Sequence, residues 1–230
     1  MDGEHMIYLE NTSANPLIQR AFGSVTQSKR KSTLSIPGDA FRDLVERGFI
    51  QPKLGMTLLA ISKLLNSTGQ VEDVHVTGIL ADSRRSLLSR LRQQLEPEVI
   101  EDGSFPSLNR CCAVTALICL DFIFLPISPP RSSTTLAQTL RTAIIRSASE
   151  LGWPQMLELL LWILFVGSLS SADLDTELWF RRRLRGATSR LKFSRFSWED
   201  MKITLKKALW VDQLHEEEAK QLFMHMMGCA

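Results

Sequence analysis

Residues 215–219 (His-Glu-Glu-Glu-Ala) come close to the helix motif of zinc proteases. That motif needs a second histidine four residues after the first, so that both imidazoles face one metal ion. Ala219 stands at this position, and His225 lies too far along the chain to replace it. His5 and His75 are remote in the sequence. The histidines therefore predict no metal site, and we expect neither a metal ion nor another cofactor.

Other motifs of catalysis are also missing from the sequence. Nucleotide-binding loops need clustered glycines, whereas the twelve glycines here are scattered. Residues 167–170 run Gly-Ser-Leu-Ser rather than the Gly-x-Ser-x-Gly of serine hydrolases. Glu199 and Asp200 lie at an expected helix start, where stabilisation of the helix explains both acids. The sequence predicts no catalytic residue and no enzyme.

One apolar stretch leaves an enzymatic alternative open. Its side chains could line a ligand pocket between helices, with Asp121 or Glu158 as the acid of an accessory enzyme. Core packing explains the stretch better, because it is apolar nearly all round. The stripe consists of Leu159, Leu160, Trp162, Ile163 and Phe165.

The strongest local charge lies between residues 176 and 196, where seven basic residues accompany one acid, Glu177. The bases are Arg181, Arg182, Arg183, Arg185, Arg190, Lys192 and Arg195. Interleaved with them are the aromatic residues Trp179, Phe180, Phe193 and Phe196. The pattern suits a solvated helix face anchored by aromatic side chains, and it also suits contact with an acidic partner, nucleic acid or a nuclear-import receptor.

Within this segment, Arg181, Arg182, Arg183 and Arg185 are the candidate residues for an interaction or nuclear-import site. Residues 29–31 (Lys-Arg-Lys) form a shorter and weaker import candidate.

Apolar residues recur at helical spacing from residue 37 onward. The expected stripes are Leu54, Leu58, Ile61 and Leu65; Ile79, Leu80, Leu87, Leu88, Leu91 and Leu95; and Leu136, Leu140, Ile144 and Leu151. Each stripe predicts one amphipathic helix with its apolar side in a core.

Prolines and capping residues mark the expected helix ends. Pro106 and the polar residues around it precede the apolar segment 111–125, and three prolines follow that segment. Ser132 or Ser133 is expected to cap the next helix, which should end before Pro154.

Two helices are predicted at the C-terminal end. Ser197 and Asp200 resemble a capping box, although Asp stands in place of the preferred Glu or Gln. Asp212 is expected to cap the last helix, with residues 216–218 (Glu-Glu-Glu) in its first turn. The expected buried faces are Trp198, Met201, Leu205 and Leu209 on the first helix, and Leu214, Leu222, Phe223 and Met226 on the second.

No segment alternates apolar and polar residues in the manner of a strand. The sequence therefore predicts an all-α fold, an irregular array of about seven to nine helices without the fixed period of a solenoid. Residues 1–35 are polar and show no sustained period, so we expect a flexible N-terminal arm there. Residues 36–230 are expected to form a single helical domain.

The composition argues against several classes of protein. The formal net charge of +2 gives no general electrostatic case for binding nucleic acid or anionic membranes. Four cysteines, three of them in an apolar segment, do not suggest a secreted disulfide framework. The apolar segments 111–125 and 156–169 are shorter than the roughly 20 residues that cross a bilayer, so we expect no membrane contact. Membrane association through these segments and the arginine-rich residues 181–195 is the least favoured alternative.

Two stretches resemble a known family. Residues 159–167 (LLLWILFVG), followed by small residues, resemble the central apolar helix of the fungal-specific regulatory domain in zinc-cluster transcription factors. Residues 198–205 (WEDMKITL) and the terminal acidic-to-apolar helix are similar to the way many such proteins end. The resemblance extends over residues 41–227. Family members commonly carry two glycines after the tryptophan helix, whereas Ser168 follows Gly167 here.

The resemblance implies a nuclear regulator that acts through ligand or partner contacts, in control of metabolic or secondary-metabolite genes. The family reads DNA through an N-terminal module of six cysteines, whereas this sequence has no Cys-x-x-Cys. The implied contact is therefore a protein partner or the transcription machinery, and DNA is reached only indirectly or through a module that this chain lacks. The alternatives are a stand-alone helical interaction subunit, with a cytoplasmic location as the alternative to the nucleus, and the accessory enzyme described above.

Overall fold

The computed structural model describes residues 38–68, 74–95, 106–124, 131–147, 156–190, 197–210 and 212–227. Within these ranges the chain forms nine α-helices and no β-strand, which confirms the predicted all-α, multi-helix array. All of the described residues belong to one unit, residues 35–230. The arm expected over residues 1–35 lies outside the described residues.

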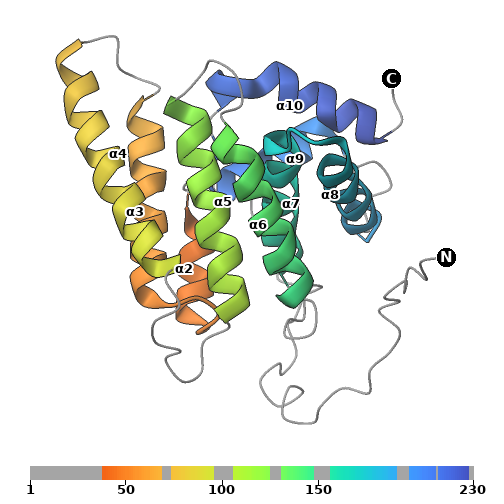
Figure 1. Cartoon of the computed structure of the whole chain (residues 1–230), viewed down its shortest axis with the longest axis horizontal. Helices are drawn as coiled ribbons and strands as arrows, with labels where there is room; N and C mark the ends of the chain where they lie inside the picture. The colour runs from red at the N-terminus through yellow and green to blue at the C-terminus, as the bar shows by residue number, and fades with distance from the viewer. Residues whose placement is uncertain are drawn as a thin grey trace, which may run out of the picture. The chain divides into compact units, whose positions relative to one another are not determined.

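The helices follow one another along the chain as Figure 1 labels them. They are α2 (Asp39–Glu46), α3 (Pro52–Thr68), α4 (Val74–Leu95), α5 (Pro106–Phe124), α6 (Arg131–Ser147), α7 (Leu157–Ser170), α8 (Leu174–Thr188), α9 (Trp198–Lys207) and α10 (Asp212–Met227). Helix α5 begins at Pro106. Proline is favoured in the first turn of a helix because an N–H there has no acceptor within the helix, and proline has no N–H.

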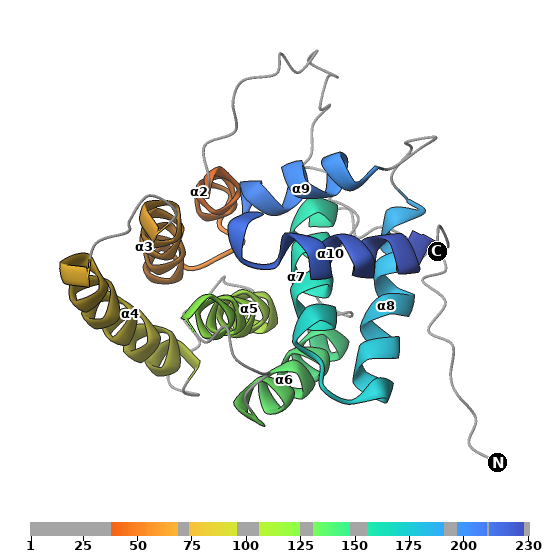
Figure 2. The same ribbon diagram turned by 90° about the horizontal axis from the view of Figure 1, so that it is seen from above.

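Helix α7 lies at the centre of the helix contacts. It packs against α5, α6, α8 and α9, and Figure 2 shows it between α5 and α8. On the other side of α5, α3 contacts α2, α4 and α5, while α10 contacts α8 and α9. A helix with neighbours on all sides needs apolar side chains all round, which is the composition of α7.

The apolar stripe of α7 forms core. Trp162, Ile163 and Phe165 are fully buried, Leu159 is buried, and Leu160 is half-buried. Phe41 of α2 meets the Trp162 ring edge-on, with 5.5 Å between the ring centroids. These contacts account for the stripe as packing.

The indole N–H of Trp162 has a specific acceptor. It donates a hydrogen bond of 3.1 Å to the carbonyl oxygen of Leu209, which follows the end of α9. The thiol of Cys119 on α5 donates to the same carbonyl at 3.9 Å, and burial raises the pKa of this thiol to about 12, so it keeps its proton. One carbonyl oxygen thus ties the chain after α9 to both α5 and α7.

Helices α7 and α8 approach closely at Gly167. A Cβ atom added there would lie 2.6 Å from Cζ and 2.8 Å from Cδ1 of Phe180, whose ring is fully buried. The absence of a side chain at this position therefore allows the ring to lie against the backbone of α7.

The other predicted stripes are largely confirmed. Leu54, Leu58, Ile61 and Leu65 are all buried on α3, as expected from their spacing. On α4, Leu87 and Leu91 are buried and Leu88 and Leu95 are half-buried, whereas the side chains of Ile79 and Leu80 lie outside the described residues. On α6, Leu140 and Ile144 are buried and Leu136 is half-buried. Leu151 lies outside the described residues.

The predicted capping box at the start of α9 is confirmed. The backbone N–H of Asp200 donates to the hydroxyl oxygen of Ser197 at 3.2 Å, and the backbone N–H of Ser197 donates to the Asp200 carboxylate at 2.9 Å. The buried face behind it includes Trp198, Met201 and Leu205. Leu209 is also buried, but it follows the end of the helix rather than lying on it.

Two predicted helix starts need correction. Helix α6 begins at Arg131, so Ser132 and Ser133 lie in its first turn rather than at the cap. Helix α10 begins at Asp212, which moves Glu216, Glu217 and Glu218 to the second turn. Helix ends are the part of a helix that a local sequence pattern defines least well.

The predicted buried face of α10 is confirmed for Leu222, Phe223 and Met226, and Ala219 is buried with them. The Leu214 side chain lies outside the described residues. No helix among those described is both long enough and apolar enough to traverse a bilayer.

Replacing Gly167 by alanine should destabilise the fold. The added methyl group must displace the buried Phe180 ring, and overpacking of this kind costs about 1–3 kcal/mol. Gly186→Ala is the matched control, because a Cβ there meets no atom within 4 Å and the exposed helix should gain about 0.5–1 kcal/mol. Urea denaturation of both variants measures the difference, and a Gly167→Ala midpoint equal to that of the parent would contradict the close contact.

The capping box should make stability depend on acid. Hydrogen bonds from Ser197 hold the pKa of Asp200 below its ordinary value. The ionised Asp200 side chain therefore contributes its full stabilisation above the pKa that it has in the unfolded chain. This stabilisation is lost as the pH falls through the lower pKa that it has in the folded protein. Asp200→Ala should cost about 1 kcal/mol at neutral pH. The urea midpoints of parent and variant should converge as the pH falls below about 4. A difference between the midpoints that does not change with pH would contradict the role of Asp200 in the capping box.

Candidate functional site: the basic outer face of α8

The start of α8 is fixed by a side-chain cap. The Asp173 carboxylate accepts a hydrogen bond of 2.8 Å from the backbone N–H of Thr176, and this bond lowers the pKa of Asp173. Asp175 and Glu177 occupy the first turn and Arg185 the last, the arrangement that the helix dipole favours. Local sequence therefore determines where α8 begins and which end carries its positive charge.

The inner side of α8 determines which residues face outward. Phe180, Leu184 and Ala187 are buried at a helical spacing of three to four residues. The positions on the opposite side of the helix must then face solvent. We define the outer face of α8 as the half-buried Trp179, the exposed residue Arg190 just after the helix end, and the exposed helix residues Leu174, Asp175, Leu178, Arg182, Arg183 and Arg185.

Two of the predicted arginines make contacts within the fold. Arg181 forms an ion pair with Glu177, and each side chain is only 26% exposed. The Nε–H of Arg185 donates a hydrogen bond of 3.1 Å to the carbonyl oxygen of Met226. Carbonyls in the last turn of a helix lack helical donors, so Arg185 supplies one to the end of α10.

A third predicted arginine belongs to an aromatic cluster. The guanidinium groups of Arg183 and Arg141 lie 5.4 and 5.5 Å from the centroid of the Trp179 ring. The ring of Trp179 also meets that of Phe180 edge-on, at 5.1 Å. Arg141 belongs to α6 and was not predicted as part of the site, because nothing in the sequence around it indicates which helix it will contact.

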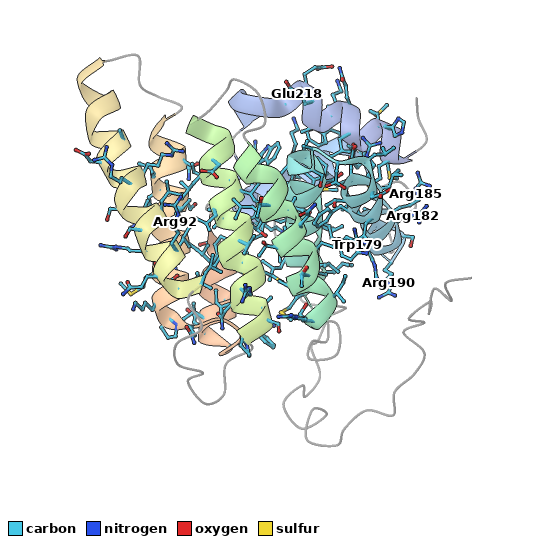
Figure 3. The ribbon with its side chains drawn as sticks, viewed as in Figure 1. Arg92, Trp179, Arg182, Arg185, Arg190 and Glu218 are labelled. Carbon is cyan, nitrogen blue, oxygen red and sulfur yellow. The ribbon has the colours of Figure 1, made fainter. Side chains whose placement is uncertain are left out.

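Arg182 and Arg190 differ from these three. Both are exposed, and Figure 3 shows them with Arg185 along the outer side of α8. Among the described residues, no acid pairs with the guanidinium of either. Among the exposed arginines, Arg183 and Arg185 therefore also make contacts within the fold, whereas Arg182 and Arg190 pair with no acid in the described part of the chain.

The rest of the basic segment lies outside the described residues. This applies to Lys192, Phe193, Arg195 and Phe196, and to the import candidate at residues 29–31.

The two acids considered for an accessory enzyme are in separate ion pairs. Asp121 of α5 contacts Arg84 of α4 at 3.5 Å, and partial burial raises its pKa although the arginine opposes the shift. Glu158 of α7 contacts Lys207 of α9 at 2.7 Å. Within the described part of the chain, His, Cys, Asp and Glu form no group of three that could hold a metal ion. These acids do not form a common site.

Comparison of the chain with protein-family models, curated proteins and solved structures finds no match in any of the three. Evidence for a function therefore comes from the exposed residues of α8.

The arginines of α8 should differ in their effect on stability. Arg185→Gln removes a charged donor from the Met226 carbonyl and should cost about 1 kcal/mol, since this site is partly exposed. Arg182→Gln should stay within about 0.5 kcal/mol of the parent, as is usual at exposed positions without contacts. Thermal or urea denaturation measures the stability of both variants. An equal loss of stability in the two would contradict the distinction between Arg185, which has a contact in the fold, and Arg182.

Proposed function

We propose that this chain is a transcription-regulator-like helical domain that acts through contacts with protein partners and has no catalytic role of its own. The observation that carries the proposal is the outer face of α8. Its inner side is locked into the core by Phe180, while Arg182 and Arg190 present charge to solvent. A rigid helix with cations directed outward is a ready docking surface for a negatively charged partner.

The charge is local rather than general, which supports a specific partner. The whole chain has a formal net charge of only +2, whereas seven of its bases accompany one acid between residues 176 and 196. Such a local excess of bases attracts anionic surfaces to this part of the chain.

Exposed leucines on the same face favour a protein over nucleic acid. Leu174 is 66% exposed and Leu178 is 38% exposed. A phosphate backbone offers these side chains no apolar contact, whereas a protein surface does. Among anionic partners, a protein therefore fits the whole face.

The resemblance to fungal regulatory domains adds the biological setting. It implies a nuclear location and a part in controlling metabolic or secondary-metabolite genes, reached through the transcription machinery. A stand-alone helical subunit that binds a full-length regulator is the alternative, and it would use the same face.

Proximity labelling in fungal cells tests this proposal. A fusion of the full chain with a biotin ligase should enter the nucleus and label proteins of the transcription machinery. Arg182→Glu/Arg190→Glu should lower that labelling to background, because both reversals repel an acidic partner.

The matched control is Arg90→Glu/Arg110→Glu, which makes the same change of charge at exposed positions on α4 and α5. It should label like the parent. Exclusion of the fusion from the nucleus, or identical labelling by both double variants, would refute the proposal.

A further inference from the structure

The outer face of α8 has two chemically different halves. Leu174, Leu178 and Arg182 stand at successive spacings of four residues, so they form one stripe along the helix. The N-terminal half of the face carries the two leucines with one exposed acid, Asp175, and the C-terminal half carries Arg182 and Arg185 and leads to Arg190 after the helix end. A ligand for the whole face must therefore be apolar at one end and anionic at the other.

Spacing argues against a single small anion as the ligand. Arg182 lies on α8, whereas Arg190 follows Ser189, the residue that caps the C-terminal end of the helix, so the two arginines stand on different parts of the segment. Carboxylates spaced along a partner segment can meet both arginines, whereas one phosphate carries its charge at a single point. The charged half thus suits acids distributed along a chain.

Trp179 lies at the border between the two halves and is already held in place. Arg141 and Arg183 flank its ring, and the ring rests on Phe180. Tryptophan and arginine are the residue types that most often dominate binding energy at protein interfaces. Because the ring is ordered by these neighbours, a partner would lose little conformational entropy in contacting it.

From these features, and resting on the proposed function above, we infer that the outer face of α8 binds an amphipathic acidic helix of a partner protein. Leucine-like side chains of the partner lie on Leu174, Leu178 and Trp179, and its carboxylates meet Arg182 and Arg190. A helix laid on a helix contacts its partner through residues spaced by three and four. The interface is small, so binding is weak and reversible.

The probe is a synthetic peptide of about 16 residues, the length scale of α8. It carries leucines at positions i and i+4 in one half and glutamates in the other, and a scrambled peptide of identical composition serves as its control. Fluorescence anisotropy measures binding of both peptides to the full chain, with a duplex DNA as the competing class of ligand.

The chain offers matched variants for each half of the face. Leu174→Ser/Leu178→Ser is paired with Met56→Ser/Ile203→Ser, since Met56 and Ile203 are exposed apolar residues on other helices, 73% and 54% accessible. Arg182→Glu/Arg190→Glu is paired with Arg90→Glu/Arg110→Glu as before. Circular dichroism and urea midpoints establish that each variant is folded.

We expect the parent to bind the amphipathic peptide and each α8 double variant to bind it about tenfold more weakly. The paired controls should stay within about twofold of the parent. The scrambled peptide should bind more weakly than the ordered one, and salt should weaken binding through the arginines.

Three results would overturn the inference: equal binding of the two peptides, unchanged binding by Leu174→Ser/Leu178→Ser, or tighter α8-dependent binding of duplex DNA. The labelling experiment separates this inference from the proposed function. If charge reversal on α8 abolishes labelling while the parent does not bind the peptide, the partner is not an amphipathic acidic helix and the proposed function stands. If charge reversal leaves labelling intact, the proposed function fails regardless of the peptide.

Discussion

The packing of α8 on α7 is the constraint on which the rest of the described structure depends. Gly167 leaves room for the Phe180 ring against the backbone of α7. Once that ring is buried, the helical period decides that Arg182 must face outward. Helix α7 is fixed in turn by Trp162, whose N–H bonds the Leu209 carbonyl after α9. A buried glycine contact and one indole hydrogen bond thus orient the candidate interaction surface.

Much of this fold could be predicted from sequence because burial of apolar area dominates helix packing and leaves a local period. The α3 stripe from Leu54 to Leu65 is an example. Capping signals were equally readable at Ser197, where donor and acceptor are only three residues apart. The start of α6 and the turn occupied by Glu216 were predicted wrongly, since helix ends are the part of a helix that a local sequence pattern defines least well.

The candidate site was predictable as a segment but not as a surface. Arg181, Arg182, Arg183 and Arg185 stand together in the sequence, yet they differ in contact. Arg185 reaches a carbonyl 41 residues further along the chain, and Arg183 shares its tryptophan with an arginine of α6. The contacts of Arg181 with Glu177 and of Arg183 with Trp179 follow from the four-residue spacing within α8. The contacts that Arg185 and Arg141 make join different helices, and no spacing rule within one helix contains those.

The central claim is that α8 presents a binding face for an amphipathic acidic helix, and amide hydrogen exchange locates such binding directly. The full chain is compared with and without the amphipathic acidic peptide, and exchange is followed helix by helix. The account predicts slower exchange across residues 174–190, with little change on α3 and α4. Protection confined to another helix, or unchanged exchange on α8 at saturating peptide, would contradict it.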